Sequence, residues 1–323
     1  MVMPVVGQLV RSTVSPKGSY YESMDHLVVV HRAAPRSDGE QLTLATVADA
    51  DMVLIGMFGT TRGSQDEGTF VACPTAGRSE AEANEAVRLA LAAIKAEMPR
   101  HLDSQAESSC ILWPDCPTPI VDFVKAEMRL LWEDHVYDLY TTDKAPTKFG
   151  VGMGSSWVDE ETGETFVIDI VRRSDFELML ANLYKYDPEY LEFITQTYPF
   201  TELNCMIRAY PKGADPTTAS HEQGEPAAWA STHYDLSIAG LTTMERFRRR
   251  KLAAKGVEVV SHLQIEFMRK HFPTVFDDGA MPPLSFGMVK DGNDASVRTM
   301  KGCGFSKLEG VRFQWIGIKL SSV

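Results

Sequence analysis

Apolar residues in the first half of the chain gather in short runs that are separated by turn residues. The runs are rich in Val, Leu and Thr, and such runs between Gly, Asp and Pro are typical of β-strands. The predicted strands cover His26–Arg32, Gln41–Val47, Met52–Phe58 and Thr69–Cys73. Residues 1–24 lack this pattern, and we expect them to form an N-terminal arm.

Two helices are predicted after these strands. Ser79 and Glu82 have the spacing of a capping box, and the apolar residues that follow recur at helical spacing as far as about Glu97. A second helix is predicted from about Thr118 to Tyr140. Together these elements predict an α/β N-terminal domain over residues 25–150.

The second half of the chain alternates between helix and strand patterns. The predicted helices are Ser174–Leu183, Asp187–Gln196, Arg248–His271 and Asn293–Lys301. The predicted strands are Cys205–Ala209, Ala227–Thr232, Leu236–Thr242, Leu284–Lys290 and Phe313–Leu320. This order predicts a second α/β domain over residues 165–323.

A glycine-rich stretch connects the two predicted domains. Gly150, Gly152 and Gly154 have a spacing that resembles a dinucleotide-binding loop. Such a loop must open directly into a helix, but the chain continues as Trp157-Val-Asp-Glu-Glu-Thr-Gly, which is not a helix start. We therefore predict a linker or hairpin here rather than a nucleotide site.

The charge of the chain is acidic and unevenly distributed. The net charge is −12; residues 1–164 carry 13 basic and 25 acidic side chains, whereas residues 165–323 carry 19 of each. This difference supports a boundary between residues 150 and 165. The overall charge argues against nucleic acid or an anionic membrane as a partner.

Cysteine usage and the chain termini indicate a cytoplasmic protein. The five cysteines form no CxxC pair, so we expect neither a disulfide framework nor a metal site. No apolar run approaches the roughly 18 residues that a membrane span requires. The first residues are interrupted by Pro and Gly and do not resemble a signal peptide.

The most specific feature is a basic cluster where a predicted strand turns directly into the long helix. Arg246, Arg248, Arg249, Arg250 and Lys251 gather at this point. A helix N-terminus presents unpaired amides, and cations there oppose the helix dipole unless an anion is bound. The cluster therefore predicts a phosphate site, with a plain basic surface patch as the alternative.

This segment resembles the signature of the GNAT superfamily of acyl-CoA N-acyltransferases. In that signature, Arg-x-x-Gly-x-Gly/Ala follows a strand and opens a helix whose amides hold the CoA pyrophosphate. Arg248-Arg-Arg-Lys-Leu-Ala253 takes these positions, with Lys251 where glycine is usual. The resemblance implies acetyl-CoA or another acyl-CoA as co-substrate. The residues that it implies for binding are Leu241, Thr242, Thr243, Met244, Arg248, Arg249, Arg250, Lys251, Leu252 and Ala253.

A second family motif follows the next predicted strand. Asn293 comes shortly after Val289, and Gly304-Phe305 follow at the family's spacing, so the resemblance implies Asn293 as a further cofactor-binding residue. Many members place a tyrosine one turn before that glycine, where it protonates the departing thiolate. Met300 stands there and cannot donate a proton. Water, Ser296 or unassisted departure are the alternatives.

The second half is most similar to the glycine N-acyltransferase-like branch. Ser174-Asp-Phe-Glu-Leu, Tyr190-Leu-Glu-Phe-Ile and Glu225-Pro-Ala-Ala-Trp229 carry this resemblance over roughly residues 165–320. It implies an α/β fold with two GNAT-like mixed sheets flanked by helices, of which the N-terminal one is degenerate. It also implies a bulge in the central strand, around 241–244, that exposes backbone groups.

Amide formation from a thioester requires a base that takes a proton from the amine. His233, Asp235 and Ser237 would share one face if this segment were a strand. Ser237 aligns with the glutamate base of the branch but cannot act as one. We expect Asp235 to be the base, with His233 as the second candidate and a plain strand-edge role as the alternative for each.

These features predict an N-acyltransferase that moves an acetyl or other acyl group from acyl-CoA to a small amine or an amino acid by direct attack. A catalytically decayed CoA-binding module is the first alternative, supported by Met300, Ser237 and Lys251. A protein N-acetyltransferase is the second. The sequence does not indicate the oligomeric state.

Overall fold

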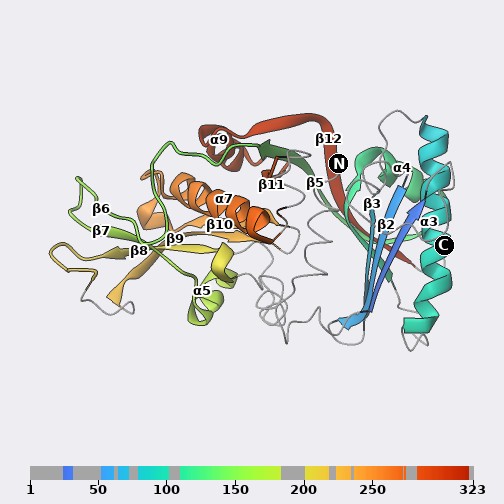
Figure 1. Cartoon of the computed structure of the whole chain (residues 1–323), viewed down its shortest axis with the longest axis horizontal. Coiled ribbons are helices and arrows are strands. Elements are labelled where there is room, and N and C mark those ends of the chain that lie inside the picture. The colour runs from blue at the N-terminus through green and yellow to red at the C-terminus, as the bar shows by residue number, and fades with distance from the viewer. Residues whose placement is uncertain are drawn as a thin grey trace. The chain divides into compact units, whose positions relative to one another are not determined.

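The computed structural model describes residues 25–31, 52–61, 65–72, 79–101, 110–182, 201–217, 223–233, 236–271, 273 and 282–319 (Figure 1). The predicted arm 1–24, the predicted strand Gln41–Val47 and the predicted helix Asp187–Gln196 lie outside these residues. The described chain divides into two compact units. One comprises the residues up to Asp138 together with those from Glu309 onward, and the other comprises Leu139–Leu308.

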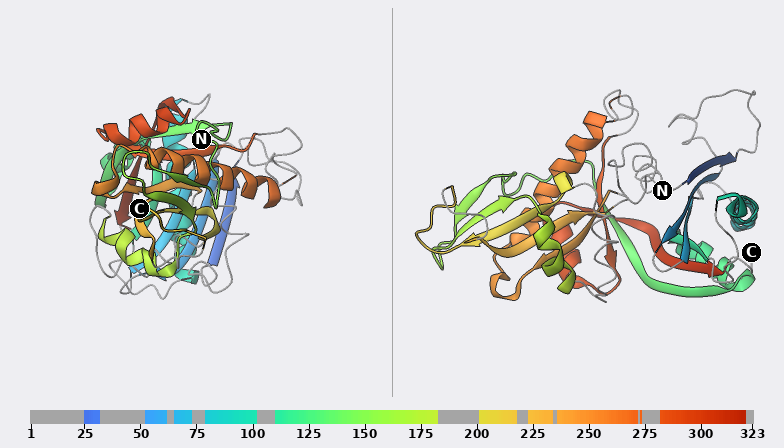
Figure 2. Two further views of the ribbon diagram at one scale, coloured as in Figure 1. Left: turned by 90° about the vertical axis from the view of Figure 1, so that its left-hand side faces the viewer. Right: turned by 90° about the horizontal axis from the view of Figure 1, so that it is seen from below.

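This division differs from the boundary at 150–165 that the charge pattern suggested. It falls within two long strands, β5 (Leu130–Thr142) and β12 (Ser306–Lys319). These strands are neighbours in the sheet, and Figure 2 shows them running side by side. The last strand therefore contributes residues to the N-terminal unit, which composition alone could not indicate.

The N-terminal unit begins with three antiparallel strands, β1 (Asp25–His31), β2 (Met52–Thr61) and β3 (Gln65–Ala72). Helix α3 (Glu80–His101) follows, and the predicted capping box is formed. The Ser79 amide donates to Glu82 Oε2 at 2.9 Å, and the Glu82 amide donates to Ser79 Oγ at 3.3 Å. Strand β4 (Cys110–Pro117) then pairs with the end of β12, from Phe313 to Lys319.

The predicted helix 118–140 is wrong in its second half. Helix α4 (Thr118–Glu127) ends where Met128 adopts an extended conformation, and β5 follows at once. Residues 130–142 contain one Trp, one Val, two Tyr and two Thr, which are residue types that suit a strand. They form a strand because they lie between β12 and β11 in the sheet, and both of these strands lie far along the chain.

The predicted α/β class, with a large mixed sheet flanked by helices, is confirmed. The described strands form a nine-stranded sheet in the order β4-β12-β5-β11-β10-β9-β8-β7-β6, beside the three-stranded sheet β1-β2-β3. The remaining strands of the large sheet are β6 (Ser156–Val158), β7 (Thr165–Asp169), β8 (Cys205–Tyr210), β9 (Glu225–Thr232), β10 (Ser237–Thr243) and β11 (Ser285–Lys290). Only β11 runs parallel to its neighbour β10 in the described registers, whereas β6 to β10 are antiparallel.

Side-chain alternation along the central strands builds two apolar layers. Cys205, Ile207, Ala228 and Ala230 pack with helix α7 (Leu252–His271), whereas Met206 and Trp229 pack with helix α5 (Phe176–Ala181). Gly256 lets α7 approach the sheet, because a Cβ there would lie 3.3 Å from that of Ala230. The two layers bury both faces of β8 and β9.

Candidate functional site

The hairpin of β9 and β10 carries a bulge close to the predicted position. Ala239 pairs with Ser231 and Thr242 pairs with Trp229, so the register shifts over Gly240 and Leu241. Gly240 has a φ of 58°, which glycine adopts without strain. The bulge thus begins slightly before the expected residues 241–244. The Met244 amide is already used, since it donates to the Ala227 carbonyl at 2.9 Å.

Beside this bulge, β10 parts from its parallel neighbour. The described register between β10 and β11 covers only Ser237 with Phe286 and Ile238 with Gly287. Beyond Ile238, β10 continues to Thr243 with pairing from β9 alone. Ligands of α/β sheets bind where neighbouring strands separate at their carboxyl ends, so this divergence marks a candidate site.

The basic cluster leads from β10 into α7, but it precedes the helix instead of forming its first turn. A 3₁₀ turn over Glu245–Phe247 is followed by a loop, and α7 begins at Leu252. Arg249 and Lys251 have φ values of 69° and 61°, which helical residues do not adopt. Lys251 therefore has the backbone conformation that glycine favours at this position of the motif.

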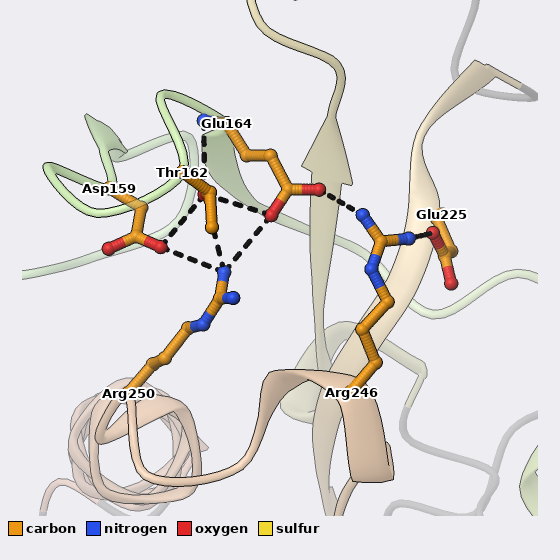
Figure 3. A network of polar contacts seen from close by, with 6 residues as sticks. All are labelled: Asp159, Thr162, Glu164, Glu225, Arg246 and Arg250. Atoms are coloured by element: carbon orange, nitrogen blue, oxygen red, sulfur yellow. Dashed lines mark hydrogen bonds and ion pairs between the residues drawn. The ribbon is translucent and has the colours of Figure 1, made fainter.

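Acidic side chains already engage two of the five cations (Figure 3). Arg250 Nη1 lies 2.8 Å from Asp159 Oδ2 and 3.0 Å from Glu164 Oε2. Arg246 forms ion pairs with Glu164 and Glu225. These contacts tie the loop to the β6–β7 connection and to the start of β9. Arg250, a predicted cofactor-binding residue, is thus paired with carboxylates that hold the loop in place.

The other three cations, Arg248, Arg249 and Lys251, are exposed. Across the described part of the chain, their side chains form no hydrogen bond or ion pair. The first amides of α7 come directly after this loop. The hydrogen bond from the Lys255 amide to the Lys251 carbonyl is the first of the helix, so the helix amides before Lys255 have no partner within it. Leu252 is buried and Ala253 is half-buried, so these two can contribute only backbone amides. Cations and free amides together suit a polyanion.

Sequence reasoning missed Lys255 and Glu258, one and two turns into α7. Lys255 Nζ lies 4.3 Å from the ring centre of Trp157 and 5.0 Å from that of Phe149. Burial lowers the pKa of Lys255, and the charge of Lys251 lowers it further, whereas that of Glu258 opposes the shift. Glu258 is buried and accepts hydrogen bonds from the amides of Phe149 and Val151. The glycine-rich stretch is therefore held against α7.

His233 and Ser237 do not lie along one strand. The His233 amide donates to the Ser237 carbonyl at 2.8 Å, the Leu236 amide donates to the His233 carbonyl at 2.9 Å, and Leu236 has a φ of 65°. The chain thus reverses between β9 and β10, and the alternation argument for one shared face is wrong. His233 is half-buried and Ser237 is buried, whereas Asp235 lies outside the described residues.

The second motif has mostly structural roles. Asn293 caps α9 (Asp294–Gly302), because its side chain accepts a hydrogen bond from the Ser296 amide at 3.2 Å. Met300 is buried against β11, where a Cβ on Gly287 would lie 2.8 Å from its methyl carbon. Burial raises the pKa of Cys205 to about 12 and that of Cys303 to about 11, so both remain neutral thiols at pH 7.

Two other kinds of site are absent from the described ranges. No group of three or more His, Cys, Asp or Glu side chains there is arranged to hold a metal ion. No described helix is long and apolar enough to span a membrane.

Comparison with known proteins identifies similar folds only. No protein-family model matches the sequence, and no curated protein matches it. A solved structure of a Drosophila protein superposes with a TM-score of 0.53 at 12% identity, covering 98% of this chain and 89% of that one. A tandem GNAT protein from the clavulanic acid biosynthesis pathway gives a TM-score of 0.48 at 11% identity, covering 99% and 88%. A GCN5-related N-acetyltransferase from Kribbella flavida gives 0.40 at 14%, covering 81% and 86%. At these identities, the likeness concerns the fold.

Proposed function

We propose that this protein is an acyl-CoA-dependent N-acyltransferase that acts on a small amine or an amino acid. The observation that carries the proposal is one continuous segment: a bulged strand that parts from its parallel neighbour, then a left-handed basic loop, then the N-terminus of a long helix. This segment offers a place for an extended thioester between β10 and β11. It also offers a place for phosphates at the helix.

The phosphates of the donor are assigned to the start of α7. The amides of Leu252, Ala253 and Ala254 have no partner within the helix, and the dipole there favours an anion. Arg248, Arg249 and Lys251 add charge next to these amides. Arg250 and Arg246 shape the loop through Glu164 and do not bind the donor in this assignment.

The bulge of β10 supplies backbone groups for the reacting carbonyl. Register pairs with β9 are interrupted between Ala239 and Thr242, so backbone polar groups in this stretch are released from the ladder. An amide donor there would stabilise the oxyanion that forms when the amine attacks. We assign direct attack of the amine on the thioester. Burial keeps Cys205 and Cys303 protonated at neutral pH, so neither of these two thiols is a nucleophile. Asp235 and His233 remain the candidate bases.

An acyl-transfer assay with detection of the acylated product tests this proposal. Purified protein is incubated with acetyl-CoA and a panel of amines and amino acids, and products are identified by mass spectrometry. We expect an acylated amine and an equal amount of free CoA, with turnover reduced by more than tenfold in Asp235→Ala or His233→Ala. Hydrolysis of acetyl-CoA at the same rate with and without amine would contradict the proposal.

A decayed, CoA-binding module is the second candidate. Two observations favour it: Met300 and Ser237, at positions where related enzymes carry a proton donor and a base, are both buried in this structure. Such a module would bind CoA and acetyl-CoA with similar affinity and would form no acylated product from any amine in the panel.

A further inference from the structure

Strand β9 buries two polar side-chain atoms that have no hydrogen-bond partner among the residues that the structure describes. The indole nitrogen of Trp229 and the hydroxyl of Ser231 are both without one, although these residues are only 1% and 0% exposed. Buried polar groups are almost always paired, so each exception requires a reason. A ligand that is not present in the structure is one such reason.

Both residues lie on the same face of β9 and beside the bulge. They alternate with Ala228 and Ala230, which face α7, so Trp229 and Ser231 face the α5 layer. Their partners across the hairpin are Thr242 and Ala239, the two residues between which the register of β10 shifts. The unpaired atoms therefore bracket the segment that we assign to the reacting carbonyl.

The opposite layer shows that this protein normally pairs its buried hydroxyls. Thr232, the next residue on β9, donates to the Leu203 carbonyl at 2.7 Å and accepts from Gln264 at 3.0 Å. Ser285 Oγ donates to Gln264 Oε1 at 2.8 Å, and Ser261 donates to the Val257 carbonyl at 2.7 Å. The hydroxyls of this layer are therefore paired, although Asn204 Nδ2 beside Thr232 also lacks a partner among the described residues. Trp229 and Ser231 differ from it because both flank the bulge of β10.

The chemistry of the two groups defines what they can bind. An indole N–H only donates, and a hydroxyl can donate, so a ligand that pairs both must present a hydrogen-bond acceptor, such as a carbonyl or carboxylate oxygen. Among the described residues, the fully buried cation is Arg208, which Asp169 and Asp175 already pair at 3.0 and 2.7 Å. A carboxylate buried at Trp229 and Ser231 would therefore lack a counter-charge, whereas a neutral carbonyl needs none.

We propose that Trp229 and Ser231 bind a neutral carbonyl group of the acyl acceptor, as found in an amino-acid amide or at the N-terminus of a peptide. This inference rests on the proposed acyltransferase function and specifies its acceptor. It places a hydrogen-bonding subsite on the α5 side of β9, next to the bulge.

Three matched amines test the subsite: glycinamide, with a neutral carbonyl; glycine, with a carboxylate; and ethylamine, with no oxygen. Wild type should prefer glycinamide in kcat/KM. Ser231→Ala and Trp229→Phe should raise KM about tenfold more for glycinamide than for ethylamine, each relative to wild type. Comparing variants with wild type for each amine cancels the intrinsic reactivity of the amines.

Ser261→Ala is the matched control, since it removes a buried hydroxyl that has partners. We expect it to lower Tm and to leave the preference for glycinamide unchanged. Ser231→Ala should not lower Tm in the free protein, because its hydroxyl makes no bond that can be lost. A drop in Tm as large as that of Ser261→Ala would contradict an unpaired hydroxyl.

A binding measurement separates failure of this inference from failure of the proposed function. With CoA present, glycinamide should raise the Tm of wild type more than ethylamine does, and Ser231→Ala should abolish the difference, whether or not turnover occurs. Equal effects of the two amines on wild type, or a preference for glycine, would overturn the subsite. CoA binding and turnover of ethylamine would in that case still support the acyltransferase.

Discussion

At the scale of single residues, the loop before α7 adopts at two positions a backbone conformation that favours glycine, although neither residue is a glycine. Arg249 and Lys251 both have positive φ values, which cost an L-residue roughly 1–2 kcal/mol each. The surrounding structure must hold them there. Residues in such conformations gather at ligand sites, which agrees with a phosphate-binding role.

Replacing Lys251 tests whether this conformation is strained. Lys251→Gly should raise the free energy of unfolding by about 0.5–1 kcal/mol, because relief of the left-handed strain exceeds the entropy that glycine adds to the unfolded chain. Lys251→Ala removes the same side chain but keeps the Cβ, so it should give no gain. Urea denaturation of the two variants checks this, and equal stabilities would contradict it.

The sequence predicts the basic cluster, but it does not predict which of the five cations pair with acidic side chains and which stay exposed. Side-chain type and spacing placed all five cations at one turn, and that was sufficient to expect a phosphate site. The partners of Arg250 and Arg246 lie 86 and 82 residues away at Glu164. Such contacts depend on sheet topology, which no local pattern reveals. The same limit hid Glu258, whose partners at Phe149 and Val151 lie on a distant segment.

At the scale of elements, a buried ion-pair cluster anchors the entrance of α5 to the sheet. Arg208 on β8 pairs with Asp169 at the end of β7 and with Asp175 just before α5. Burial raises the pKa of Asp169, but hydrogen bonds from the Ile170 amide, Arg172 and Arg208 outweigh it and hold the pKa below its usual range. The cluster therefore stabilises the fold only while Asp169 is ionised.

Because the pKa of Asp169 is lowered in the folded protein, Asp169 should contribute less to stability at low pH. The contribution of Asp169 is fully present above its unfolded pKa of about 3.9 and is lost as the pH falls through the lower folded value. Asp169→Asn should destabilise by about 1.5–3 kcal/mol at pH 7 and by much less at pH 2–3. Urea denaturation at both values checks this, with the exposed Glu160→Gln as control. An equal loss at both pH values would argue against the charge as the cause.

Helices and strands could be predicted wherever one local sequence signal dominated. The prediction failed where pairing with distant strands determined the secondary structure. The capping box at Ser79 and the long apolar stripe of α7 gave correct helices. Residues 130–142 could serve as helix or strand, and the neighbouring strands β11 and β12 selected the strand. His233 and Ser237 do not share one strand, although the alternation of polar residues at positions 233, 235 and 237 imitates one.

At the scale of the whole molecule, the chain is acidic but its proposed donor site is basic. The net charge of −12 repels polyanions in general, so a phosphate ligand must be bound by local geometry and not by the overall field. Exposed Arg248, Arg249 and Lys251 at the start of α7 provide that geometry. Binding of CoA should therefore depend on these few side chains.

The most direct test is isothermal titration of CoA and acetyl-CoA into wild type and an Arg248→Ala/Arg249→Ala double variant. A matched control, Arg269→Ala/Lys270→Ala, removes two exposed cations at the other end of α7. We predict that wild type and the control bind both ligands and that the Arg248/Arg249 variant binds at least tenfold more weakly. Absence of binding by wild type, or equal affinity of all three proteins, would contradict the proposed donor site.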